Sequence, residues 1–276
     1  MARLTAAAVV VLLTLLTQIG GLVMLLVWGV SRLALPRTIG AWRRALINAL
    51  LFVVVYAAIS VLLVPPLAAL GGRVPLPCRA QPDSPFAAGS VFLCALNRHY
   101  VVPDLVALLS ELSSEIDRAF PGTTTLFLDA SFPFLNGFPL LPHLSHGDGR
   151  KLDLAFYYAD ADGRYLPAAT RSPIGYWAFE QPSAGDASPC GERSLLSLRW
   201  DLDLLQDKFS DRVLEPRRTS AALQWLLTEG LRFKVDRIFI EPYLAARLGV
   251  QASPALGFQG CRAARHDDHI HIQIKR

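Results

Sequence analysis

Two long apolar runs open the chain. Residues 4–31 and residues 45–72 carry no charged side chain and consist mainly of Leu, Val and Ala. Each run has 28 residues, whereas about 20 suffice for a helix to cross the hydrocarbon core of a bilayer. A secretory signal peptide has a shorter apolar stretch of about 7–15 residues and fits neither run. The pattern predicts a membrane anchor of two transmembrane helices over residues 1–72.

After residue 72 the pattern becomes that of a folded domain. Residues 73–91 are rich in Pro, Gly, Ala and Ser and predict a linker, followed by a domain over residues 92–276. Apolar residues at helical spacing and runs of β-branched and aromatic residues predict its elements. We expect helices over 104–120, 220–233 and 242–248, and strands over 123–132, 152–159, 236–241 and 269–275. Because these do not follow a regular βαβ order, the fold class predicted is α+β, with a small, mainly antiparallel sheet and flanking helices.

Charge is distributed unevenly between the two parts. Of the 27 Lys and Arg residues, five lie within residues 1–72, which hold no acidic residue; the remaining 22 face 23 acidic residues. The folded part is therefore close to neutral, which argues against a nucleic-acid partner. Four of the five basic residues, Arg32, Arg37, Arg43 and Arg44, lie between the two apolar runs. The positive-inside rule places this loop in the cytoplasm, so both ends of the anchor and the large domain would face outward.

Cysteine usage agrees with export of the domain. Cys78, Cys94, Cys190 and Cys261 all lie outside the apolar runs. An even number of cysteines in an oxidising compartment predicts two disulfides, with three possible connectivities. The alternative is four reduced, buried thiols in a cytosolic domain. The chain contains no C-x-x-C motif, which argues against a four-cysteine zinc site.

Five of the six histidines fall in two short clusters, and the second cluster lies on the predicted strand 269–275. In its sequence HIHIQIK, successive side chains point to opposite faces of the sheet. Ile270, Ile272 and Ile274 would enter the core, whereas His269 and His271 would share the other face, about 6–7 Å apart. The alternative is a polar, solvent-facing edge strand.

The first cluster comprises His143 and His146, followed by a glycine-containing turn and Asp153. A turn of this kind allows His146 and Asp153 to point to one centre at the start of the strand 152–159. Two histidines and one aspartate form a typical open catalytic zinc set that leaves a position for water. The alternative is a turn with ordinary polar residues.

Together the two clusters resemble the LAS metallopeptidases, and most closely the penicillin-insensitive murein endopeptidases. The H-x-S-H-x-x-G turn is matched by His143, Ser145, His146 and Gly149, and the closing H-D-x-H-x-H strand by residues 266–271. The resemblance covers about residues 92–276. It implies a zinc peptidase of the bacterial cell wall with the LAS fold.

The resemblance also implies roles for individual residues. His146, Asp153 and His271 would bind Zn²⁺, and His269 would act as a general base or proton shuttle, assisted by His266. His143, Gly149 and Asp268 would support the ligands or contact substrate. The substrate would be a peptidoglycan peptide, cut by an endopeptidase or a D,D-carboxypeptidase. The protein would be anchored in the bacterial cytoplasmic membrane with its catalytic domain on the periplasmic side. The alternative is an inactive domain that keeps the fold and binds peptidoglycan or a protein partner; the sequence identifies no such partner.

Overall fold

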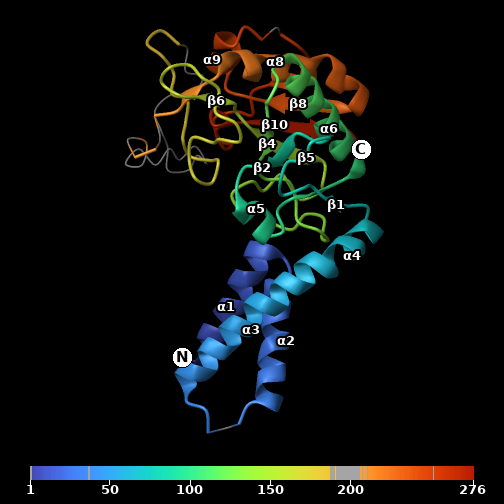
Figure 1. Ribbon diagram of the computed structural model, residues 1–276, viewed down its shortest axis with the longest axis vertical. Coiled ribbons are helices and arrows are strands. Elements are labelled where there is room, and N and C mark those ends of the chain that lie inside the picture. Colours follow the sequence, from blue (N-terminus) through green and yellow to red (C-terminus); the bar gives the residue numbers. More distant parts are fainter. Residues whose placement is uncertain are drawn as a thin grey trace.

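The chain forms a helical stalk that carries an α+β domain (Figure 1). The computed structural model describes residues 2–36, 38–186, 190, 206, 208–209, 211–250 and 252–276. The stalk comprises α1 (Ala2–Thr17), α2 (Gly20–Ala34), α3 (Ala41–Leu62) and α4 (Val64–Leu70). The domain follows directly from the end of α4.

The first apolar run is a pair of helices, so the prediction of one transmembrane helix over residues 4–31 is wrong. The chain breaks at Gln18, which has a positive φ of 67°, and the Thr17 hydroxyl accepts a hydrogen bond of 2.7 Å from Gly20 N–H. α2 then returns along α1 (Figure 1). A Cβ atom on Gly21 would lie 2.0 Å from the Thr14 hydroxyl oxygen, so glycine is what permits this close contact between the helices.

The second apolar run contains the one described helix that is long and apolar enough to cross a membrane. This helix is α3, with 22 residues, none of which is buried. The core helix of a soluble protein would be buried. Because the first run folds back, the N-terminus lies at the same end of the stalk as the turn between α2 and α3 (Figure 1). This arrangement replaces the expected one, in which both ends of the anchor face outward.

The stalk is fixed to the domain by specific contacts. Gln18 Oε1 accepts a hydrogen bond of 2.8 Å from the backbone N–H of Phe134. Tyr56 of α3 donates to the carbonyl of Ala95 at 2.8 Å and accepts from the Asn97 amide at 2.9 Å. An apolar cluster of Ile19, Val64, Ala68 and Tyr100 fills the junction. The orientation of the domain relative to the stalk is therefore set by these hydrogen bonds and by the buried apolar cluster.

The domain is built on a six-stranded sheet with the order β2-β4-β5-β10-β8-β9. Three of its five strand pairings are antiparallel and two, β2 with β4 and β8 with β9, are parallel. The α+β class and the mainly antiparallel sheet are thus confirmed. The strands are β2 (Phe86–Ala88), β4 (Thr125–Phe127), β5 (Lys151–Ala155), β8 (Val235–Phe239), β9 (Leu256–Gly257) and β10 (His269–Ile274). Four short strands form two separate pairs: β1 (Val74–Pro75) with β3 (Tyr100–Val101), and β6 (Tyr158–Ala159) with β7 (Val213–Leu214).

Helices cover one face of the sheet and form the main core with it. The larger ones are α6 (Pro103–Ala119) and α8 (Pro216–Leu227), whose leucines pack against Ile270, Ile272 and Ile274 of β10. The predicted alternation of β10 is confirmed, because these isoleucines are at most 2 % exposed. The shorter helices are α5 (Val91–Ala95), the 3₁₀ helix η1 (Glu229–Phe233) and α9 (Pro242–Arg247). The opposite face of the sheet is left for the histidines.

Several element boundaries differ from the predicted ones. Residues 73–91, expected as a linker, hold β1 and β2, and their Leu76 and Phe86 are buried in the core. The strand predicted over 123–132 shortens to β4, because the chain after Phe127 leaves the sheet to reach the histidine turn. The strand predicted over 152–159 divides into β5 and β6. The helices at 104–120 and 242–248 are confirmed within one residue at each end.

Two disulfides join the four cysteines, as the even count predicted. The pairs are Cys78–Cys94 and Cys190–Cys261, separated by 16 and 71 residues. The first pair ties the segment before β2 to α5. The second joins Cys190 to Cys261, in the segment that precedes β10.

We expect removal of either disulfide to destabilise the domain, and we expect the larger effect from the disulfide that closes the longer loop. Replacing both cysteines of the Cys78–Cys94 pair by Ala should lower the free energy of unfolding by about 3 kcal/mol. The same replacement in the Cys190–Cys261 pair should lower it by about 4 kcal/mol, because a longer closed loop constrains the unfolded chain more. Thermal unfolding of the full chain in detergent shows which variant loses more stability. A larger loss of stability on removal of Cys78–Cys94 would contradict the prediction.

Candidate metal centre

The register between β5 and β10 brings the first two candidate ligands together. His271 is paired directly with Asp153 across the antiparallel strands, so both side chains lie on the same face. His271 Nδ1 is 2.8 Å from Asp153 Oδ1. Both residues are buried, at 2 % and 0 % exposure. A carboxylate removed from water in this way requires positive charge or hydrogen bonds around it.

The third ligand comes from the turn between β4 and β5. His146 Nε2 lies 3.1 Å from His271 Nδ1 and 3.3 Å from Asp153 Oδ1. The turn is held by Ser131, whose hydroxyl donates to the carbonyl of His146 and accepts from Gly149 N–H at 3.0 Å. Gly149 has a φ of 76°, a conformation that glycine adopts without strain. Its contribution is thus to the shape of the turn.

The donor set fits a divalent cation. His146 Nδ1 lies 2.8 Å from the carbonyl oxygen of Ala130, which can only accept, so Nδ1 carries the proton and Nε2 presents a lone pair to the centre. Metal–ligand bonds of about 2.0–2.1 Å at tetrahedral angles place neighbouring donors about 3.3 Å apart. The separations here run from 2.8 to 3.3 Å. His146, Asp153 and His271 can therefore hold one metal ion.

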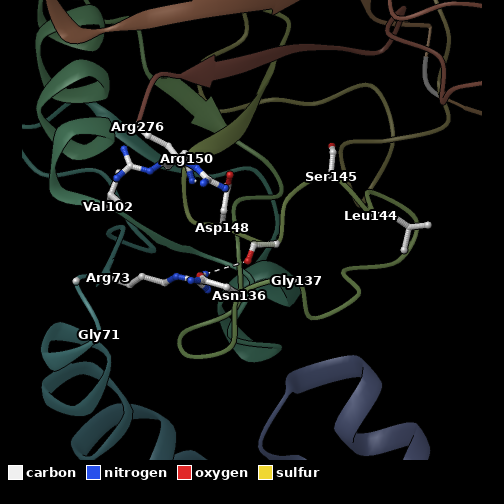
Figure 2. A pocket seen from close by; sticks show the side chains of 12 residues that line it. Gly71, Arg73, Val102, Asn136, Gly137, Leu144, Ser145, Asp148, Arg150 and Arg276 are labelled. Atoms are coloured by element: carbon white, nitrogen blue, oxygen red, sulfur yellow. Dashed lines mark hydrogen bonds between the residues drawn. The ribbon is translucent and has the colours of Figure 1, made fainter.

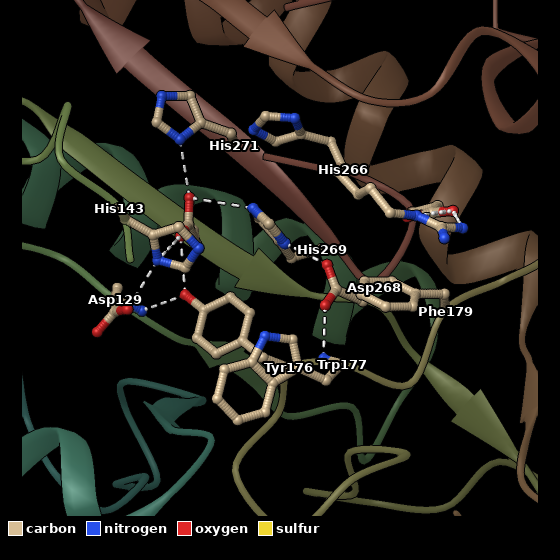
Figure 3. Close-up of polar contacts among 12 residues, drawn as sticks. Asp129, His143, Tyr176, Trp177, Phe179, His266, Asp268, His269 and His271 are labelled. Carbon is tan, nitrogen blue, oxygen red and sulfur yellow. Dashed lines mark hydrogen bonds and ion pairs between the residues drawn. The ribbon is translucent and has the colours of Figure 1, made fainter. Parts of the chain in front are cut away.

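His143 and His269 also lie close to the Asp153 carboxylate, and Figure 3 shows both of their rings below that of His271. His269 Nε2 is 3.6 Å from Asp153 Oδ1, and His143 Nδ1 is 3.4 Å from Asp153 Oδ2. These two histidines and Asp153 form a second group of possible metal donors. Asp153 is therefore the residue common to both groups.

Acidic side chains orient these two histidines. Asp268 Oδ1 is 2.5 Å from His269 Nδ1, and its Oδ2 accepts a hydrogen bond of 2.7 Å from Trp177 N–H. Asp129 Oδ2 is 2.8 Å from His143 Nδ1. Asp268 thus holds His269 in place from the position directly before β10.

Electrostatics divide the histidines into two kinds. Burial lowers the pKa of His271 to about 4, and burial together with the neighbouring His269 and His271 holds the pKa of His266 well below its usual range. Burial also disfavours the charged form of His269, but Asp153 and Asp268 outweigh it and raise its pKa to about 9. Burial opposes ionisation of Asp153 too, yet the imidazoles of His146, His269 and His143 keep its pKa well below the ordinary value. His269 is thus the proton-holding imidazole, next to neutral ones.

Residues that sequence reasoning missed complete the site. Tyr176 donates a hydrogen bond of 2.7 Å to Asp153 Oδ2 and accepts one of 2.8 Å from Asp129 N–H. Arg98 forms a two-pronged ion pair with Asp129, with both contacts at 2.6 Å. No local motif marks these residues, because they are scattered between residues 98 and 176. Tyr176 and Trp177 lie within residues 160–219, for which the sequence pattern predicts neither a helix nor a strand; residues 187–189, 191–205, 207 and 210 of this stretch lie outside the described residues.

A cavity of about 300 Å³ reaches His143 and His269, the two histidines beside the metal-binding group. Its polar lining residues are His143, His269, Asp268 and Arg265, and its apolar lining includes Tyr176, Trp177, Phe179, Pro142 and Leu144. Trp177 is 40 % exposed, at the edge of this cavity. His266 is buried between Phe239 and the other histidines, with ring centroids 4.9 Å from His269 and 5.5 Å from His271.

One further group of possible metal donors, Cys78, Cys94 and His99, is not a metal site as the structure stands. The two sulfurs are joined in a disulfide and offer no thiolate. His99, given no role by the sequence, lies away from the other histidines, and burial lowers its pKa to about 4.

Comparison with known proteins adds no family. No known family model matches the sequence, and no curated protein matches it with significance. The assignment of the site therefore depends on the residues and their geometry.

We expect Asp153 and Tyr176 to be needed for metal binding to different degrees. Asp153→Asn should abolish zinc binding, because it removes the charge shared by all the imidazoles. Tyr176→Phe should weaken zinc binding about 10–100-fold, because the supporting hydrogen bond to the carboxylate is lost. Equilibrium dialysis with elemental analysis measures both.

Asp162→Asn is the matched control, because this aspartate lies exposed in the turn after β6. It should bind zinc as the wild type does. Zinc binding by Asp153→Asn equal to that of the control would contradict the ligand set.

Proposed function

We propose that the chain is a membrane-anchored zinc peptidase that hydrolyses amide bonds in peptidoglycan peptides. The observation that carries this proposal is the convergence of His146, Asp153 and His271, with His269 beside them in the lining of a cavity. The metal class follows from the donor set, two imidazoles and one carboxylate. The peptidoglycan substrate rests on the resemblance of the two histidine motifs to the murein endopeptidases.

In this proposal His146, Asp153 and His271 hold the zinc ion. Zinc in such a site polarises the substrate carbonyl and lowers the pKa of a bound water to about 7. Tyr176 keeps the Asp153 carboxylate in place through its hydroxyl hydrogen bond of 2.7 Å. His146 is fixed in the metal-binding tautomer by the Ala130 carbonyl.

His269 moves the proton. It lies 3.6 Å from Asp153, lines the cavity, and is held by Asp268. Its Nε2 has no hydrogen-bond partner among the described residues, so it is available to a water or substrate group. His269 would hold its proton less tightly once a cation was bound at Asp153, because the carboxylate charge would then be offset. His269 then takes a proton from the attacking water and returns it to the leaving amine.

The remaining site residues shape the environment of the reaction. His266 is neutral because burial and the adjacent imidazoles lower its pKa, so it serves as a hydrogen-bonding group near His269. His143, fixed by Asp129, lies at the cavity wall and contacts substrate in this proposal. The aromatic lining, with Trp177 at the rim, packs against the apolar part of the peptide.

Measurements of zinc content and activity together should distinguish a metal ligand from the proton-transfer residue. His271→Gln should lose both zinc and activity, because a ligand is removed. His269→Gln should retain most of its zinc and lose turnover by about 10²–10⁴-fold, the usual contribution of a general acid–base group. Digestion of purified peptidoglycan, followed by mass analysis of the released fragments, measures turnover; elemental analysis measures zinc.

The fragments also identify the bond. Cut cross-links indicate an endopeptidase, whereas release of terminal D-Ala indicates a carboxypeptidase. Stoichiometric zinc without any released fragment would contradict the peptidase and favour a domain that only binds peptidoglycan. Loss of zinc in His269→Gln with retention in His271→Gln would reverse the two roles.

The stalk supports a membrane location with the domain outside the cytoplasm. α3 is apolar and unburied, Arg32, Arg43 and Arg44 cluster where α2 turns into α3, and the domain carries two disulfides. In this proposal the arginine-rich end is cytoplasmic, and the domain at the other end is exported. The α1–α2 hairpin then begins and ends on the cytoplasmic side.

Topology is testable by labelling single introduced cysteines. Ala2→Cys and Thr38→Cys should both be protected from a membrane-impermeant thiol reagent added to spheroplasts, whereas Ser183→Cys in the domain should react. The native cysteines do not interfere, because all four are in disulfides. Reaction of Ala2→Cys together with protection of Thr38→Cys would restore the arrangement of two complete spans.

A further inference from the structure

A second cavity, of about 580 Å³, lies between the end of α4 and the turn that carries His146. We call it the arginine pocket and define it by Gly72, Arg73, Asn136, Asp148, Arg150 and Arg276. It contains none of the proposed metal ligands and no group of the proton-transfer pair. Arg150, Arg276 and Asp148 lie on one side of it, and Arg73 and Asn136 on the other (Figure 2).

The charge in the pocket is predominantly positive. Three arginines line it, and Asp148 is the acidic side chain among its lining residues. Asp148 already has partners, because its carboxylate lies 3.2 Å from Lys151 Nζ and accepts a hydrogen bond of 3.0 Å from Arg150 N–H. The carboxylate is therefore balanced from outside the pocket, and the arginines retain an excess of positive charge.

Arg73 is the buried member of the set. Its side chain donates to the carbonyl of Phe132, to Asn136 Oδ1 at 2.5 Å and to the carbonyl of Gly147 at 3.0 Å. All three acceptors are neutral, so they position the guanidinium without cancelling its charge. Burial lowers the pKa of Arg73, and the nearby Asp148 carboxylate offsets this effect only in part. A guanidinium has five N–H donors, so donors remain for a further acceptor.

The position of the pocket points to the membrane surface. α4 exposes Leu67 and Leu70, at 53 % and 86 %, and ends directly before Gly71 and Gly72 of the pocket. Exposed leucines that follow an unburied apolar helix fit the outer edge of the hydrocarbon layer. Arg73 comes three residues after Leu70, so a membrane that covers the two exposed leucines would bring its headgroups to the level of Arg73.

We propose that the arginine pocket binds a phosphate group, and that the phosphate is that of an anionic lipid headgroup. Guanidinium groups bind phosphate oxygens in pairs of charge-assisted hydrogen bonds. Arg150 and Arg276 approach the phosphate from one side and Arg73 from the other. This site depends on insertion of the stalk in a membrane and is independent of zinc and of peptidase activity. It would fix the height of the domain above the bilayer.

The test uses the full chain in detergent and two probes, phosphatidylglycerol and inorganic phosphate. Native mass spectrometry counts retained phosphatidylglycerol, and the increase in thermal stability with each probe gives an apparent affinity. The variant is Arg150→Gln with Arg276→Gln. The matched control is Arg232→Gln with Arg237→Gln, which removes the same charge outside the pocket; Arg237, like Arg150, donates to a backbone carbonyl.

We expect the pocket variant to bind phosphatidylglycerol at least about tenfold more weakly than the wild type, with the control unchanged, because each lost guanidinium removes a charge-assisted pair. Equal weakening in both variants, or in neither, overturns the site. Inorganic phosphate that binds as tightly as the lipid, with the same sensitivity to the pocket variant, overturns the lipid as the source and keeps the phosphate site.

Zinc content of the same samples separates this proposal from the previous one. The pocket variant should keep the zinc content of the wild type, so loss of lipid binding with zinc intact concerns the pocket alone. Arg276→Gln by itself is the second variant, because Arg276 is exposed and its replacement disturbs no buried contact. It should weaken lipid binding in the same direction; an unchanged affinity counts against the role of Arg276.

Discussion

The pairing of β5 with β10 is the constraint on which the rest of the structure depends. It places Asp153 opposite His271 on one face of the sheet. Ile272, the residue after His271, points to the other face and packs in the core against the helices. A shift of one residue would exchange the two faces of β10. Isoleucines would then replace the imidazoles around Asp153, and His269 and His271 would enter the apolar core. The packing of β10 against α6 and α8 therefore fixes the site as well as the fold.

Two buried carboxylates explain why so many cationic groups gather on this face. Asp129 is balanced by Arg98 and His143, and its pKa is lowered although burial opposes this. The side-chain groups in contact with the Asp153 carboxylate, among the described residues, are imidazoles and the Tyr176 hydroxyl. A site in which the central carboxylate lacks a permanent cation suits a bound metal ion. The Arg98–Asp129–His143 chain, in contrast, is complete by itself and acts as a fixed wall.

The stalk and the domain form a continuous structure. Tyr56 in α3 is hydrogen-bonded to Asn97, and the next residue, Arg98, pairs with Asp129, which orients His143. α3 is thus only a few contacts from the cavity wall. In the proposed membrane arrangement, a stalk attached in this way would set both the distance and the orientation of the cavity relative to the bilayer, and the arginine pocket beside α4 would lie at the same boundary. A flexible linker at residues 73–91 would have left both undetermined.

The sequence alone determined the α+β class, the use of the cysteines in disulfides, and the histidine clusters with Asp153, because alternation, cysteine count and motif spacing are local signals. Only the tertiary structure decided that residues 4–31 fold back at Gln18, since a long apolar run is equally compatible with one helix or two. It also decided the disulfide pairing and the inclusion of residues 73–91 in the sheet. Asp129, Tyr176 and the arginine pocket came from the tertiary structure too. Their partners are distant in the chain, and a buried charge is stabilised by whichever groups the fold brings next to it, which no local pattern records.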